Sequence, residues 1–168
     1  MKLYIYKGLE SEKILHPKDI THVIVQEDVT LIRPRMFEHC HELISVIMFD
    51  KVTKIGRYAF NSCLKLQFIK LSRALQYIGD YCFLQCYAMR SYSMPATVKK
   101  IGKNAFHRND KLRVLNIPPM LEFNCLPDLS LTAIMTVIAR RINYTEEGVD
   151  DMEMHFKVNE LIENNQPE

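Results

Sequence analysis

Residues 55–71 read IGRYAFNSCLKLQFIKL, and the pattern within them returns along the chain at a fixed step. The opening pair, Ile55-Gly56, recurs as Ile78-Gly79 and as Ile101-Gly102, so each step is 23 residues. Six further columns follow this step: Val29, Val52, Leu75 and Val98; Phe37, Phe60, Phe83 and Phe106; Cys40, Cys63 and Cys86 with Asn109 in fourth place; Leu43, Leu66, Met89 and Leu112; Val46, Ile69, Tyr92 and Leu115; and Met48, Leu71, Met94 and Ile117. A fixed period in the twenties is typical of a solenoid in which each coil adds one layer.

The repeat predicts a half coil, then four full coils, with one local plan. The half unit covers 20–28, and the full units cover 29–51, 52–74, 75–97 and 98–120. In the second full unit, residues 52–55 form a short apolar piece, and Gly56 suits a tight turn with positive φ. Residues 58–63 suit one or two helical turns, and Ile69 and Leu71 alternate as in a strand.

The unit I-G-x-x-A-F-x-x-C-x-x-L-x-x-I-x-L resembles the BspA-type leucine-rich repeat, over residues 29–120 with a half unit from about residue 20. The resemblance implies an α/β repeat, a right-handed solenoid of about four to five 23-residue coils with its strands on one face. It also implies a protein-interaction module, and some bacterial and protozoan members are surface proteins involved in adhesion. The family motif contains no catalytic residues, so none are implied here. The first and last units depart from the motif, with Arg33-Pro34 in place of the glycine turn and Asn109 in place of cysteine.

An open solenoid needs a cap at each end. We expect an N-terminal cap over 1–19, with a strand at Leu3 to Tyr6, and a C-terminal helical cap over 121–163. Apolar residues recur at steps of three and four from Leu131 to Ile142, which predicts an amphipathic helix over about 129–142. We favour a second helix over 145–163, apolar on two faces and so suited to contact both the domain and a partner, although a strand over 155–158 is the alternative. We expect residues 164–168 to be frayed.

The composition is that of an ordinary globular protein. The 168 residues are 48% hydrophobic and 25% charged, with a net charge of +2, which gives no electrostatic reason to expect a nucleic-acid or membrane-surface partner. The N-terminal sequence does not read as a signal peptide, and no run is long enough to span a membrane. With five cysteines, an odd number, we expect a reducing compartment and a cytoplasmic or nuclear protein.

The residues that carry chemistry have structural explanations. The cysteine column faces inward beside phenylalanines, which favours packing over reactive thiols. Cys82 with Cys86, and the run 39–41 (His-Cys-His), lack the second ligand pair of a structural zinc site. There is no recognisable nucleophile, phosphate-binding or dinucleotide-binding motif. We therefore expect no enzyme activity, no metal and no cofactor.

The strands' outward positions are more informative. If Val46 and Met48 point inward, positions 45, 47 and 49 point outward. The outward columns are His22, Ser45, Phe68, Ser91 and Val114; Ile24, Ile47, Lys70, Ser93 and Asn116; and Gln26, Phe49, Ser72, Pro95 and Pro118. The candidate partner-binding residues are Ile24, Ile47, Phe49 and Phe68. Exposed contiguous apolar surface marks a binding site, unless a terminal segment such as 145–163 covers it; both alternatives stay open.

Charge is also uneven along the chain. Residues 98–114 carry six Lys and Arg against one Asp, and residues 145–168 carry eight acidic residues against one Lys. We favour an acidic tail folded near the basic last coil over a site for an acidic partner that the tail masks. The leading hypothesis is a non-enzymatic scaffold that binds a protein through its strand face. The alternatives are an exported adhesive surface protein and, third, a thiol-based redox protein or enzyme.

Overall fold

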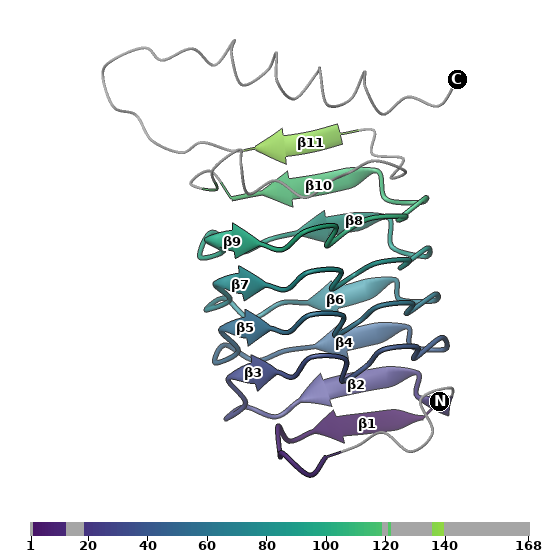
Figure 1. Ribbon diagram of the computed structural model, residues 1–168, viewed down its shortest axis with the longest axis vertical. Coiled ribbons are helices and arrows are strands. Elements are labelled where there is room, and N and C mark those ends of the chain that lie inside the picture. The colour runs from purple at the N-terminus through teal and green to yellow at the C-terminus, as the bar shows by residue number, and fades with distance from the viewer. Residues whose placement is uncertain (1, 13–18, 119–120, 122–135, 140–168) are drawn as a thin grey trace.

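The computed structural model describes residues 2–12, 19–118, 121 and 136–139, and shows a stack of about five coils (Figure 1). The longer strands lie on one side of each coil, here called the long side: β1 (Leu3–Tyr6), β2 (His22–Val25), β4 (Ser45–Ile47), β6 (Phe68–Lys70), β8 (Ser91–Ser93), β10 (Val114–Ile117) and β11 (Thr136–Ala139). The two-residue strands lie on the other side, here called the short side: β3 (Leu31–Ile32), β5 (Lys54–Ile55), β7 (Tyr77–Ile78) and β9 (Lys100–Ile101). All pairings between them are parallel. The register places Ser45 beside Phe68 and Ile32 beside Ile55, which confirms the 23-residue columns.

The phenylalanine column forms a continuous stack through the core. Neighbouring ring centroids lie 5.2 Å apart for Phe37 and Phe60, 5.4 Å for Phe60 and Phe83, and 5.5 Å for Phe83 and Phe106, with nearly parallel planes. Tyr6 from β1 meets the first ring edge-on at 5.5 Å. All five rings are buried. Each coil therefore adds one aromatic layer, as the repeat predicts.

The turn between the short and long sides is built from left-handed residues, not from a helix. Two columns of non-glycine residues have φ between 54° and 62°: Arg35, Tyr58, Tyr81 and Asn104, and His39, Ser62, Gln85 and Arg108. Their backbone directs alternate amides to the next coil, so that Tyr58 donates to the carbonyl of Asp80 at 3.0 Å and Phe60 to that of Cys82 at 2.9 Å. The helical turns expected over 58–63 are wrong, because an α-helix would use these amides within its own segment.

The glycine column is required by close contact between coils. Among the described residues the one glycine with a positive φ is Gly8, at 73°, so the positive φ expected at Gly56 is wrong. A Cβ on Gly79 would lie 2.5 Å from the backbone nitrogen of Arg57 and 2.6 Å from the carbonyl carbon of Gly56. A Cβ on Gly56 would lie 2.5 Å from the nitrogen of Pro34. Because these are backbone atoms, the coils approach this closely only where the side chain is absent.

Arg33 stands at the one glycine position of the four full units where a side chain has room. It occupies the glycine position of the first full unit, where the preceding chain is the N-terminal segment instead of a full coil. Its guanidinium donates to the carbonyls of Glu10, at 2.7 Å, and of Glu12, and its Nε lies 3.4 Å from the hydroxyl of Tyr6. The departure from the motif therefore fastens the N-terminal segment over the end of the stack.

The C-terminal end differs from the sequence expectation. Residues 136–139 form β11, so a helix over 129–142 is wrong, and Val114 lies beside Thr136, a step of 22 residues instead of 23. Three β-branched residues in a row at 136–138 favour a strand, and β11 pairs with the edge that β10 would otherwise leave open. The described residues contain no α-helix, so the C-terminal helical cap and the α/β label lack support. The expectations for 145–163 and 164–168 lie outside the described residues.

The long side is divided between β6 and β8. Strands β1, β2, β4 and β6 form one sheet and β8, β10 and β11 another, whereas the short side is a single four-stranded sheet. The division falls beside Tyr92, the one aromatic in its column, which packs against Phe83 at 5.1 Å and Phe106 at 4.7 Å. Its column neighbour Ile69 is only half-buried. The buried hydroxyl of Tyr92 finds no hydrogen-bond partner among the described residues.

Candidate strand-face binding site

The outward side of the strands on the long side, here called the strand face, presents two rows of side chains across β1, β2, β4 and β6. Pairing puts Leu3, His22, Ser45 and Phe68 in one row, and Ile5, Ile24, Ile47 and Lys70 in the next. These residues point away from the core because the residues between them on each strand point into it. Neighbouring strands lie about 4.8 Å apart, so the three isoleucines form an unbroken apolar line of about 10 Å.

The predicted site residues lie on this face, with different exposure. Ile24 and Ile47 are adjacent and half-buried, whereas Phe49 is 38% exposed and Phe68 56% exposed. The two phenylalanines are not neighbours, because Phe68 lies in register with Ser45, four residues before Phe49 along the strand direction, or about 13 Å. They stand on opposite sides of the isoleucine row.

The structure adds two residues that the sequence reasoning missed. Leu3 and Ile5 on β1 are 50% and 52% exposed and extend both rows by one strand. Leu3 pairs with His22, a step of 19 residues, so the 23-residue repeat does not reach β1. The alternation of Leu3 to Tyr6 was the available signal, since a parallel strand added at the edge continues the outward columns. We define the strand-face patch by Leu3, Ile5, Ile24, Ile47, Phe49 and Phe68.

One of the three outward columns does not hold along its length. Ser72, expected to face outward beside Phe49, is fully buried. Its hydroxyl accepts a hydrogen bond from the amide of Ala74 at 3.1 Å, which turns the side chain back onto its own loop. Serine makes such local turns readily, because its short side chain reaches the backbone two residues on. Phe49 therefore has no outward-facing neighbour from its column in the next coil.

On β8 and β10 the strand face is polar apart from Val114, which is half-buried. Ser91 and Ser93 on β8 are exposed, and Asn116 on β10 donates to the hydroxyl of Ser93 at 3.4 Å. Lys70 marks the boundary, because it continues the isoleucine row and is exposed. No carboxylate among the described residues pairs with Lys70. Within the described part of the chain, the patch therefore ends at a positive charge without a carboxylate partner.

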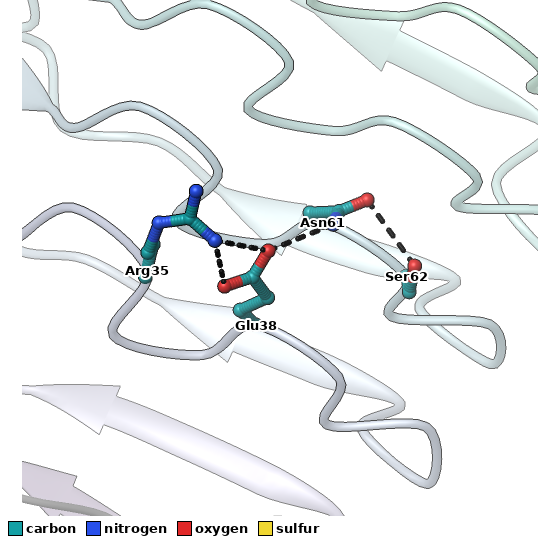
Figure 2. A network of polar contacts seen from close by, with 4 residues as sticks. All are labelled: Arg35, Glu38, Asn61 and Ser62. Carbon is teal, nitrogen blue, oxygen red and sulfur yellow. Dashed lines mark hydrogen bonds and ion pairs between the residues drawn. The ribbon is translucent and has the colours of Figure 1, made fainter.

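Another polar cluster follows the turn edge (Figure 2). Glu38 accepts from Arg35 at 2.8 Å and from the side-chain amide of Asn61 at 2.9 Å, and the hydroxyl of Ser62 lies 3.2 Å from the amide oxygen of Asn61. The Arg35 guanidinium also lies 4.5 Å from the ring centre of Tyr58. Each of these polar groups is satisfied by its neighbour, so the cluster joins successive coils and offers no open site.

The described cysteines are buried, and their thiols stay protonated. Cys40, Cys63, Cys82 and Cys86 are free thiols with no exposed surface, which confirms the expected inward packing. Desolvation raises the pKa of Cys40 and of Cys86 to about 12, and raises that of Cys63 well above its usual value. The Cys63 thiol donates to the carbonyl of Phe37 at 3.2 Å. Thiols that hold their protons in this way are poor nucleophiles.

Within the described residues no group of three His, Cys, Asp or Glu side chains is arranged to hold a metal ion.

The basic run of the last coil is exposed: Lys99, Lys100, Lys103, Arg108, Lys111 and Arg113 all face solvent. The amide of Lys103 donates to Asp80 at 2.9 Å. In the same described part of the chain, no helix has the length and apolar character needed to cross a bilayer.

Comparison with known proteins identifies the repeat. The model of the BspA-type leucine-rich repeat region matches residues 11–124 in six copies. No curated protein matches the sequence significantly. The structure is similar to a leucine-rich repeat protein of T. pallidum, with a TM-score of 0.61 and 22% identity over 67% of this chain and 57% of that one.

Two further solved structures share the fold. A leucine-rich cell surface protein of Faecalibacterium prausnitzii gives a TM-score of 0.65 at 22% identity over 81% of this chain and 40% of that one. The pneumococcal vaccine antigen PcpA gives 0.63 at 18% identity over 88% of this chain and 40% of that one. The chain thus spans less than two thirds of each of these proteins, and the similarity is one of fold.

Proposed function

Because the chain belongs to the BspA-type leucine-rich repeat family, we propose that it is a non-enzymatic scaffold that binds another protein through its strand face. The observation that supports this is the strand-face patch, in which Ile5, Ile24 and Ile47 form a continuous apolar row with Leu3, Phe49 and Phe68 beside it on the same side of the solenoid. Contiguous exposed apolar surface is typical of protein-binding sites. We expect Phe49 and Phe68 to be the anchors, because aromatic residues, phenylalanine included, are enriched at the core of protein interfaces.

The test is affinity capture from the source cell with the full chain as bait. The double variant Phe49→Ala with Phe68→Ala is expected to lose the partner that the native chain captures, while circular dichroism and thermal unfolding remain native-like. Capture of the same partner, at the same yield, by this double variant would overturn the proposal.

The chain offers a matched control for this experiment. Leu9 and Leu31 are 56% and 37% exposed, close to the values for Phe68 and Phe49, but they lie off the strand face, after β1 and on β3. The double variant Leu9→Ala with Leu31→Ala removes similar apolar surface elsewhere and is expected to keep the partner. Loss of capture by both double variants would mean that general surface apolarity, and not the strand face, retains the partner.

We propose a cytoplasmic or nuclear location, which suits the four free thiols of the described residues because a reducing compartment keeps them so. The competing proposal is an exported adhesive surface protein, which gains support from the cell surface protein of F. prausnitzii that shares the fold. Fractionation of the source cell, with protease treatment of intact cells, separates the two. Digestion of the protein on intact cells would decide for the surface.

A further inference from the structure

We infer that the strand-face patch receives one amphipathic α-helix of a partner protein, lying across the strands with its C-terminal end over Lys70. This inference rests on the proposed function and specifies what kind of segment the face binds. It starts from the isoleucine row, in which Ile5, Ile24 and Ile47 present one apolar side chain from each successive strand. A ligand that follows this row runs along the solenoid axis, perpendicular to the strands.

The spacing of the row favours a helix over an extended segment. Successive strands are about 4.8 Å apart, and an α-helix rises about 5.4 Å per turn, so the mismatch over two steps is about 1.2 Å. An extended chain presents side chains on one face every 6.6 Å or so, and its mismatch over the same two steps is about 3.6 Å. One apolar residue per helical turn therefore meets each isoleucine in turn.

The width of the patch agrees with a single helix. Phe68 pairs with Ser45, which is two residues before Ile47 along the strand direction. Phe49 is two residues after Ile47. At about 3.3 Å per residue, the two phenylalanines bracket a strip about 13 Å wide. A helix with its side chains is about 10–12 Å across, so a single helix lying over the isoleucine row reaches both phenylalanines.

Lys70 gives the helix a direction. It continues the row one strand beyond Ile47, is exposed, and has no carboxylate partner among the described residues. The C-terminal end of a helix carries partial negative charge, which a cation stabilises. A glutamate one turn beyond the last apolar residue would add a direct ion pair. The partner segment is therefore an apolar stripe of three turns, ending in an acidic turn over Lys70.

The experiment uses the full chain and three labelled synthetic peptides of about four turns each, followed by fluorescence anisotropy. The first peptide has an apolar residue in each of three turns and a glutamate in the fourth. The second has lysine in place of that glutamate, and the third carries two central prolines that prevent a helix. The glutamate peptide is expected to bind about fivefold more tightly than the lysine peptide, and the proline peptide to bind weakly.

Variants of the chain locate the contact. Lys70→Glu is expected to reverse the preference between the first two peptides, and Ile47→Asp to weaken both. Lys54→Glu is the matched control, because Lys54 is also exposed but lies on β5, in the sheet of the short side. This variant should leave the preference for the glutamate peptide over the lysine peptide unchanged. Thermal unfolding confirms that each variant is folded.

Each contrary result overturns a stated part of the inference. Equal binding of the proline peptide overturns the helical mode, and an unchanged preference in Lys70→Glu overturns the direction. Displacement by an unlabelled peptide of residues 145–163 overturns the partner, since the occupant would then be this chain's own segment. If no peptide binds while capture of the partner still depends on Phe49 and Phe68, the helical ligand is wrong and the scaffold proposal stands. If the peptides bind but capture of the partner does not depend on Phe49 and Phe68, the scaffold proposal is wrong and the helix-binding face stands.

Discussion

Asn109 takes the place of a fourth cysteine directly beside Cys86, and its side-chain oxygen accepts the amide hydrogen of Cys86 at 2.8 Å. The Cys63 and Cys86 thiols each donate to the carbonyl of a phenylalanine in the preceding coil. Asn109 does the same through its side-chain amide, which donates to the carbonyl of Phe83 at 3.0 Å and also to that of Phe106. An asparagine can serve three buried groups at once, where a thiol serves one.

We predict that Asn109→Ala lowers the free energy of unfolding by about 3 kcal/mol, because it leaves buried backbone groups of two coils without partners. Asn109→Cys should cost less, since a thiol can still donate to the carbonyl of Phe83. Urea unfolding of both variants measures the order. Equal losses in the two variants would show that the hydrogen bond to Phe83 contributes little.

We predict that Gly79→Ala destabilises the protein by about 3 kcal/mol, because its Cβ would overlap the backbone of residues 56 and 57. Gly8→Ala is the comparison. Its Cβ would meet the movable side chain of Val29 at 3.2 Å, so its main cost is the positive φ, about 1 kcal/mol. If the two variants unfold at the same urea concentration, contact between coils is not the reason for the glycine column.

The repeat made the columns, the register and the inward packing of Cys63 and Phe60 predictable from sequence, because periodicity reports which residues share a layer. It could not give the reason for Gly56, since a close approach between coils and a positive φ both demand glycine. It also could not give β11, because the apolar residues around Thr136 satisfy a helical period as well as a strand. Leu3 and Ile5 were missed because β1 joins the sheet at a different step.

We predict that Tyr92→Phe raises the free energy of unfolding by about 1 kcal/mol, because it removes a buried hydroxyl without a partner and keeps the ring contacts with Phe83 and Phe106. For a chain of this size the midpoint of thermal unfolding should rise by about 2–4 °C. Tyr6→Phe is the control, since the Tyr6 hydroxyl accepts from the amide of Arg33 at 3.3 Å and its removal should destabilise. A lower midpoint in Tyr92→Phe would reveal a partner for this hydroxyl.

We predict that Cys40→Ala is less stable than the native chain at about pH 8 and more stable at about pH 10.5. Burial raises the pKa of Cys40 from 9.0 to about 12 in the folded state. Between these values the folded thiol keeps a proton that the unfolded thiol loses, so native stability falls as the pH rises, by up to about 1.4 kcal/mol per pH unit. At about pH 10.5 the native chain has lost about 2 kcal/mol that the variant never had, against a cost of about 1 kcal/mol for the deleted thiol.

Urea unfolding under reducing conditions at several pH values measures this crossing, and the other buried thiols and tyrosines cancel because both chains contain them. Cys40 suits the test because its thiol donates no hydrogen bond within the described residues, whereas the thiols of Cys63 and Cys86 each donate one. A difference between the two chains that stays constant from pH 8 to about pH 10.5 would mean that the folded thiol ionises near its ordinary pKa. That result would restore the cysteine column as a source of reactive thiolates.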